Sequence, residues 1–205
     1  MSALSRVAER FRTAGERLLG GADRRMTAAV VLPLAETSSN WMVRSQIDLL
    51  RRRGRNPALE ASPHVSLKLG FKVADPEPLA AWLERLARES PPVQLTLRDV
   101  GRFEEGIIYV NVVATPELER LRQRVLRDLR TEFGVAPGRF EGDEFRFHAT
   151  LTYGLPREAV DDELAALRRE RVEFRETSRF VDLWLHTGTH WLTYRRAVLS
   201  GRGEA

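Results

Sequence analysis

The chain has 205 residues, of which 42% are hydrophobic and 30% charged, a balance typical of a globular protein with a substantial core. It has no cysteine, which excludes disulfide and thiolate chemistry and favours a cytoplasmic location, and its apolar runs are too short to cross a bilayer. The formal net charge is +4, carried almost wholly by arginine because Lys68 and Lys72 are the only lysines. A basic surface favours a phosphate-bearing partner, although arginine-rich helices are more often solvated faces.

The first 26 residues are predicted to form a separate helical extension. Apolar residues recur there at helical spacing between arginines, until Gly20 and Gly21 end the pattern. The start of the chain lacks the apolar stretch of a secretory signal. The extension is suited to dock on the body, pair with another chain or lie on an anionic membrane surface. We therefore divide the chain into an extension, 1–26, and a body, 27–205.

The body alternates strand patterns with helical patterns. A buried strand is expected at 27–34 and a helix at 36–53, whose apolar stripe would be Trp41, Met42, Ile47 and Leu50. After a strand that begins at His64, Asp75 and Pro76 are expected to open a second helix. A hairpin follows, with strands at 93–103 and 107–114 and its turn at Glu104–Gly106.

The second half of the body repeats this order. Thr115 is expected to cap a long helix, and a strand at 147–153 follows the loop GVAPGRFEGDE. A helix over 156–170 and a hairpin over about 180–199 complete the chain. Because a strand, a helix and a hairpin recur in each half, we expect an α+β protein of two lobes, each an antiparallel sheet backed by helices on one face.

One heptad occurs twice. HVSLKLG at 64–70 and HATLTYG at 148–154 both fit H-x-[ST]-L-x-x-G and use two of the four histidines. The alternative is two core histidines that bond neighbouring hydroxyls by coincidence, but the shared leucine and glycine argue against chance.

The alternation of side chains along a strand places each histidine and its hydroxyl on one face. His64, Ser66 and Lys68 share a face in the first copy, and His148, Thr150 and Thr152 in the second. Residues two apart lie roughly 6.6–6.8 Å apart along a strand. An imidazole and a hydroxyl at that spacing are able to contact one tetrahedral anion, so the two polar faces are expected to line a groove between the lobes.

HVSL and HATL, 84 positions apart, resemble the paired H-x-[ST] motifs of the 2H phosphoesterase superfamily, which includes the bacterial 2′-5′ RNA ligase-like proteins and cyclic phosphodiesterases. The resemblance covers about residues 27–199, including the element order and the central hairpin. It implies a bilobal, pseudo-twofold fold with a central cleft. It also implies chemistry on 2′,3′-cyclic phosphates or 2′-5′ linkages that needs neither metal nor cofactor.

The resemblance assigns roles to a few residues. His64 and His148 match the catalytic histidines, and Ser66 and Thr150 match the phosphate-binding hydroxyls. Tyr153 stands where many bacterial RNA ligase-like members have arginine, and in this respect the chain is more similar to some cyclic nucleotide phosphodiesterases. Tyr153 is therefore a candidate phosphate contact, but it reaches the face of His148 only if its strand has a bulge. Lys68 lies on the same strand face as His64, so its side chain is expected either to reach the phosphate or to lie in solvent at the rim of the groove.

The expected function is a metal-independent phosphodiesterase that opens 2′,3′-cyclic phosphates on RNA 3′ ends or small cyclic nucleotides, with one histidine as base and the other as acid. Ligation is the reverse reaction. Alternatives are hydrolysis of ADP-ribose 1″,2″-cyclic phosphate or of 2′-5′ oligonucleotides, and a non-catalytic RNA or nucleotide binder. A monomer is favoured.

Other patterns are weaker. His186 and His190 have the spacing of a helical metal pair, but Gly188 and the strand-like flanks favour a hairpin tip. Arg146 shares the face of His148 and is a further candidate for a phosphate contact. The aromatic residues that are candidates either to stack a base or to fill the core are Phe103, Tyr109, Trp191 and Tyr194.

Overall fold

The computed structural model describes residues 25–202, apart from 104–105 and 143. The predicted helical extension lies outside the described residues except for Arg25 and Met26, and Met26 already begins the first strand. The turn residues Glu104 and Glu105 of the predicted central hairpin also lie outside them.

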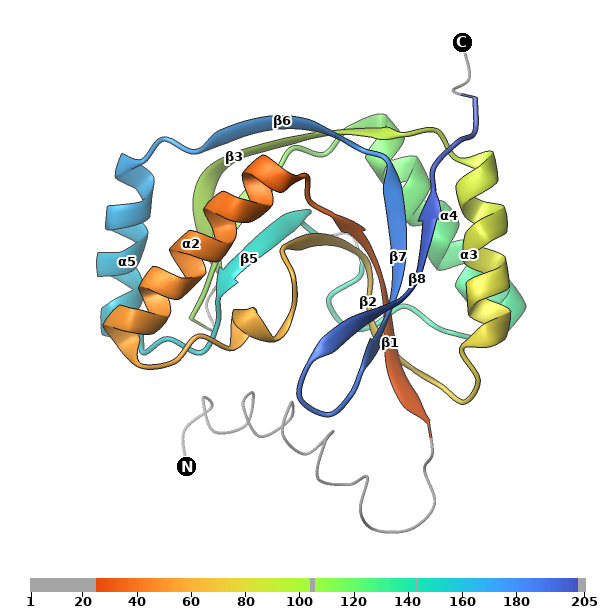
Figure 1. The fold of residues 1–205 in the computed structure, drawn as a ribbon, viewed down its shortest axis with the longest axis horizontal. Coiled ribbons are helices and arrows are strands. Elements are labelled where there is room, and N and C mark those ends of the chain that lie inside the picture. The colour runs from red at the N-terminus through yellow and green to blue at the C-terminus, as the bar shows by residue number, and fades with distance from the viewer. Residues whose placement is uncertain (1–24, 104–105, 143, 203–205) are drawn as a thin grey trace.

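Two four-stranded antiparallel sheets form the described part of the body (Figure 1). The first sheet has the order β2-β1-β7-β8, and the second has the order β5-β4-β3-β6. The strands of the first sheet are β1 (Met26–Pro33), β2 (His64–Val73), β7 (Phe180–His186) and β8 (Trp191–Val198). Those of the second are β3 (Val93–Phe103), β4 (Ile107–Val112), β5 (His148–Thr152) and β6 (Glu173–Ser178).

Helices back each sheet, and two of them cross from one half of the chain to the other. Helices α3 (Glu77–Glu89) and α4 (Pro116–Phe133) pack on strands of the first sheet, and α2 (Glu36–Arg53) and α5 (Arg157–Arg169) on strands of the second. Thus α2 follows a strand of the first sheet yet packs on β5, and α4 follows a strand of the second sheet yet packs on β2. The predicted bilobal α+β fold is confirmed.

The two histidine strands lie at the centre of the molecule. Both β2 and β5 are edge strands of their sheets, and they contact one another between the lobes (Figure 1). The apolar side of each strand, with Val65 and Leu67 in β2 and Ala149 and Leu151 in β5, is fully buried in a core shared by both sheets. Core packing therefore fixes which face of each strand is buried, and the histidine lies on the opposite face.

Three details differ from the sequence expectations. Strand β6 was not predicted, because EFRETS alternates charged and polar residues as an exposed edge strand does. In α2, Ile47 and Leu50 are exposed, whereas Gln46 is buried with two serines, since the helix turns a partly polar face to β5. Thr115 caps α4 as expected. At α3 the N-cap is Pro76 instead of Asp75, and the carboxylate of Asp75 accepts a hydrogen bond from the backbone N–H of Glu77, the first residue of the helix.

Within the described residues, each helix is too short or too polar to serve as a transmembrane segment.

Candidate active site

Each catalytic candidate begins a strand and is held by the same local contact. The Nδ1 atom of His64 lies 2.8 Å from the carbonyl oxygen of Ser62, and Nδ1 of His148 lies 2.7 Å from the carbonyl oxygen of Arg146. A carbonyl only accepts, so Nδ1 carries the hydrogen in both rings. The neutral imidazole then keeps its lone pair on Nε2, which is the atom left to exchange a proton with a substrate.

Aromatic side chains fix the orientation of both imidazoles. The ring of His64 packs on Trp184 with the centroids 4.5 Å apart. The ring of His148 packs on Phe103 and Tyr109, at 5.1 Å and 5.3 Å. The sequence pointed to Phe103 and Tyr109 only as base-stacking or core residues and gave no sign of Trp184, which comes 120 positions after His64.

The electrostatic surroundings favour the neutral form of both histidines. Burial lowers the pKa of His64 to about 4, opposed by the hydrogen bond to the Ser62 carbonyl and assisted by the charge of His148. Burial also lowers the pKa of His148, again opposed by a backbone carbonyl. Strands β2 and β5 contact one another and the charge of His148 acts on His64, so the two imidazoles lie near one another.

The hydroxyl companions lie on the same strand face as the histidines, opposite the buried face. Ser66 pairs with Val31 across the first sheet, and Thr150 pairs with Tyr109 across the second. Both side chains are half-buried, and within the described residues neither hydroxyl makes a hydrogen bond. Their predicted contact with a phosphate stays a prediction, but both hydroxyls are available to donate.

The ammonium group of Lys68 forms a buried ion pair with Glu141. Its Nζ lies 2.6 Å from Glu141, in an ion pair whose side chains are 3% and 0% exposed. The other carboxylate oxygen of Glu141 accepts a hydrogen bond from the backbone N–H of Leu69 at 2.6 Å. The phosphate contact expected for Lys68 is therefore replaced by a structural role, because the loop after α4 covers its ammonium group.

Tyr153 is also turned away from a direct phosphate role. The register of β4 and β5 shifts between Tyr109 and Ile108, which supplies the irregularity that the sequence required. The hydroxyl of Tyr153 then donates to the carbonyl of Pro57, in the short 3-10 helix η2 (Pro57–Glu60), at 2.9 Å. Burial raises the pKa of this phenol. The phosphate contact expected for Tyr153 is replaced by a link between the end of β5 and the segment that leads to His64.

Side chains from each half hold the histidine strand of the other half. Gln46 in α2 donates to the carbonyl of Thr150 at 3.1 Å, and Asn56 donates to the carbonyl of Leu151 at 3.0 Å. Glu141, from the loop after α4, holds β2 in the same way. These buried polar residues were missed because nothing in the sequence distinguishes them from surface polar residues.

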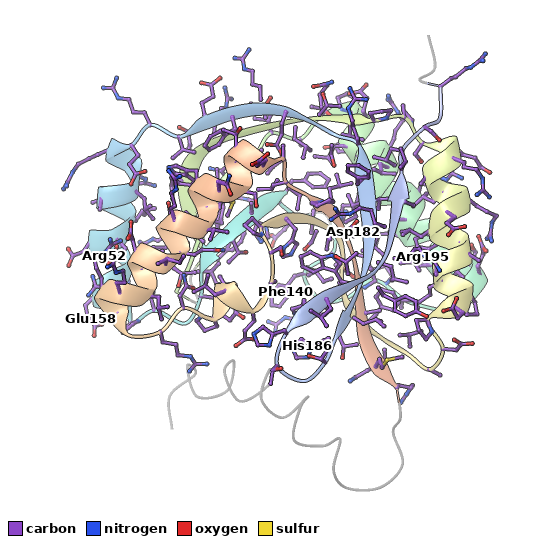
Figure 2. The ribbon with its side chains drawn as sticks, viewed as in Figure 1. Arg52, Phe140, Glu158, Asp182, His186 and Arg195 are labelled. Carbon is purple, nitrogen blue, oxygen red and sulfur yellow. The ribbon has the colours of Figure 1, made fainter. Side chains whose placement is uncertain are left out.

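The remaining candidates lie at the margin of the site. Trp191 packs on a small buried cluster of Ala29, Val31 and Trp184, whereas the hydroxyl of Tyr194 donates to the carboxylate of Glu77 in α3. His186 and His190 lie at the predicted hairpin tip, where Figure 2 labels His186. In the described ranges, no group of three or more His, Cys, Asp or Glu side chains is arranged to hold a metal ion.

The family follows from comparison with known proteins. A model of the 2′-5′ RNA ligase superfamily matches residues 39–189, which is most of the chain and includes both histidine motifs. The chain belongs to the 2′-5′ RNA ligase superfamily. The resemblance to 2H phosphoesterases drawn from the two motifs is thereby confirmed.

Solved structures of proteins with low sequence identity to this chain show the same fold. TT0787 of Thermus thermophilus is 19% identical with a TM-score of 0.62, and the match covers 87% of this chain and 100% of that one. E. coli LigT complexed with 3′-AMP is 17% identical with a TM-score of 0.60, covering 87% and 99%. LigT complexed with NADP+ is 16% identical with a TM-score of 0.55, covering 86% and 99%. A comparison with curated proteins finds no significant match.

Proposed function

We propose that this member of the 2′-5′ RNA ligase superfamily is a phosphodiesterase that opens 2′,3′-cyclic phosphates on RNA 3′ ends or small nucleotides. One observation carries the proposal. Two neighbouring imidazoles each have Nδ1 on a backbone carbonyl, and within the described residues neither their Nε2 atoms nor the hydroxyls two residues later make a hydrogen bond. A nucleotide in the related LigT structure agrees with such a substrate class. A cytoplasmic location belongs to the same proposal.

The pKa values suggest which histidine is the base. The charge of His148 is one of the causes that lower the pKa of His64 to about 4, so a proton on His148 helps to keep His64 neutral. The negative phosphate of a bound substrate raises the pKa of both groups and so favours one imidazolium in the complex. We therefore assign His64 as the general base and His148 as the general acid.

The reaction needs no group beyond these side chains and water. Nε2 of His64 takes a proton from water while the water oxygen bonds to phosphorus. The bond from phosphorus to one ribose oxygen breaks, and Nε2 of His148 gives that oxygen its proton. Ser66 and Thr150 donate hydrogen bonds to the non-bridging oxygens, where negative charge increases. Two histidines with opposite protonation states predict a bell-shaped pH–rate profile.

Turnover of 2′,3′-cyclic AMP, an RNA with a cyclic phosphate end and a 2′-5′ dinucleotide tests the proposal. His64→Ala and His148→Ala should each lower kcat by about 10²–10⁴-fold. His190→Ala at the hairpin tip is the matched control and should keep normal kcat. Near-normal turnover in either site variant, or activity abolished by EDTA and restored by metal, would defeat the mechanism. Binding without turnover in the unmodified protein would identify a nucleotide-binding module instead.

A further inference from the structure

An arginine-lined hollow adjoins the second histidine. It has a volume of about 630 Å³ and lies between strands β3 and β4, the segment before β5 and the end of α5. Four arginines line it against a single acidic residue, Asp99: they are Arg102, Arg146, Arg168 and Arg171. A hollow with this charge balance favours an anionic group.

Three contacts connect the hollow to the candidate active site. Tyr109 lines the hollow and also packs its ring on His148. Asn111, which lines it too, is the direct partner of His148 across β4 and β5. Arg146 precedes His148 by two residues and holds Nδ1 of the imidazole through its carbonyl. The hollow therefore adjoins the position that a phosphate bound to His148 would occupy.

Two of the arginines are available to a ligand. Arg102 pairs with Asp161, and Nε of Arg168 donates to the carbonyl of Val100 at 3.2 Å. Within the part of the chain that the structure describes, the exposed side chains of Arg146 and Arg171 have no ion pair or hydrogen bond. A guanidinium presents five N–H donors in a fork that matches phosphate oxygens, so these two are suited to phosphate binding.

The backbone around the hollow is strained. Asp99 and Arg171 have φ angles of 61° and 49°, and among the described residues they alone combine a positive φ with a side chain. Such conformations are unfavourable for residues with a side chain and tend to occur at functional sites. Gly101 contributes a second constraint, because a Cβ there would lie 2.7 Å from the ring of Tyr109. The glycine thus leaves room for the ring of Tyr109 between the hollow and His148.

We propose that this hollow binds a second phosphate of the substrate, through Arg146 and Arg171, while the histidines act on the cyclic phosphate. The inference rests on the proposed function and narrows it. The enzyme would prefer substrates with more than one phosphate, either an RNA strand through its neighbouring internucleotide phosphate or ADP-ribose 1″,2″-cyclic phosphate through its pyrophosphate.

The test compares kcat/KM for three substrates: 2′,3′-cyclic AMP, a short RNA ending in the same cyclic nucleotide, and ADP-ribose 1″,2″-cyclic phosphate. The quantity of interest is the ratio of each larger substrate to 2′,3′-cyclic AMP. Arg171→Ala and Arg146→Ala should lower that ratio roughly tenfold, which corresponds to about 1.4 kcal/mol. Arg88→Ala, at an exposed arginine of α3 in the other lobe, is the control and should leave the ratio unchanged.

The outcomes separate the hollow from the catalytic proposal. A fall for the RNA alone identifies an internucleotide phosphate, and a fall for ADP-ribose 1″,2″-cyclic phosphate alone identifies a pyrophosphate. Unchanged ratios in both arginine variants would overturn the inference while leaving the phosphodiesterase intact.

If the unmodified protein turns over none of the three substrates, a binding measurement tests whether the hollow binds a phosphate. The affinity for a short RNA with a 3′-phosphate, measured by titration calorimetry at several salt concentrations, should drop in Arg171→Ala. The dependence of log K on log salt should also become shallower by about one phosphate contact. Equal affinity and equal salt dependence would overturn the inference.

Discussion

Replacement of Glu141 by alanine should destabilise the protein strongly, although Glu141 lies in a loop. The substitution leaves the ammonium of Lys68, which is 2% exposed as a residue, without its carboxylate, and it removes the acceptor of the Leu69 N–H. Removal of one partner of a buried ion pair typically costs about 3–5 kcal/mol. Since domains of this kind are stable by roughly 5–15 kcal/mol, the loss is a large part of the total.

Equilibrium unfolding in urea measures this effect, provided that the slope against denaturant stays constant between variants. A surface pair gives the matched control: Glu132 bonds Arg85, and both side chains are more than 40% exposed. Glu132→Ala should therefore cost only about 0–1 kcal/mol. A loss below about 1 kcal/mol in Glu141→Ala, the range of a surface pair, would refute the buried-pair reasoning.

The double variant Lys68→Met, Glu141→Leu separates the two contributions. Replacement of both charges by apolar groups removes the unpaired ammonium, so most of the lost stability should return. The remaining deficit comes from the N–H groups of Leu69 and Gly138, which both lose their acceptor, and a buried N–H without a partner costs about 1–3 kcal/mol. A double variant as unstable as Glu141→Ala would show that the charge on Lys68 is not the cause.

Three further predictions follow from the site. In an NMR titration His64 should titrate near pH 4 and His148 below its usual range. Because both folded pKa values lie below the unfolded value, their contribution to stability is present above about pH 6.5 and is lost as pH falls through the folded values. Titration of His64 above pH 6.5 would contradict the burial argument. Gly101→Ala should displace Tyr109 from His148 and lower kcat by roughly 10–100-fold with normal circular dichroism, whereas unchanged kcat would show that the ring position is unimportant. Asn56→Ala should lower the free energy of unfolding by about 1–3 kcal/mol in urea, because two buried carbonyls lose their donor, and a neutral result would refute the proposed support of β5.

The sequence revealed the fold and the centre of the site because both depend on local, repeated patterns. The alternation in β2 and β5 places His64 with Ser66 and His148 with Thr150, and core burial of the intervening residues enforces that alternation in the structure. The element order required only periodicity, caps and turn residues. Each of these signals is contained within a few consecutive residues.

The rest depended on contacts between distant residues. The alternation of side chains along the strand placed Lys68 on the same face as His64. It does not show which loop covers that face, because the residue that pairs with Lys68, Glu141, lies 73 positions away in the sequence. The prediction that Ile47 is buried failed for the same reason. The apolar stripe of α2 did not reveal that the helix packs a polar side chain, Gln46, on the edge strand β5 and so leaves Ile47 exposed. The positive φ of Arg171 and the hollow around it have no signature in the sequence.

The interleaved order of the first sheet has a consequence for biosynthesis. Strand β1 is paired on one side with β2 and on the other with β7, where Ala29 is opposite Trp184. A ribosome must therefore translate beyond codon 184 before His64 can acquire the indole on which it packs. Nascent chains released after codon 154 but before codon 184 would carry both histidine motifs yet present an unfinished sheet. Ribosome-bound intermediates should therefore remain inactive and sensitive to protease until β7 emerges from the exit tunnel.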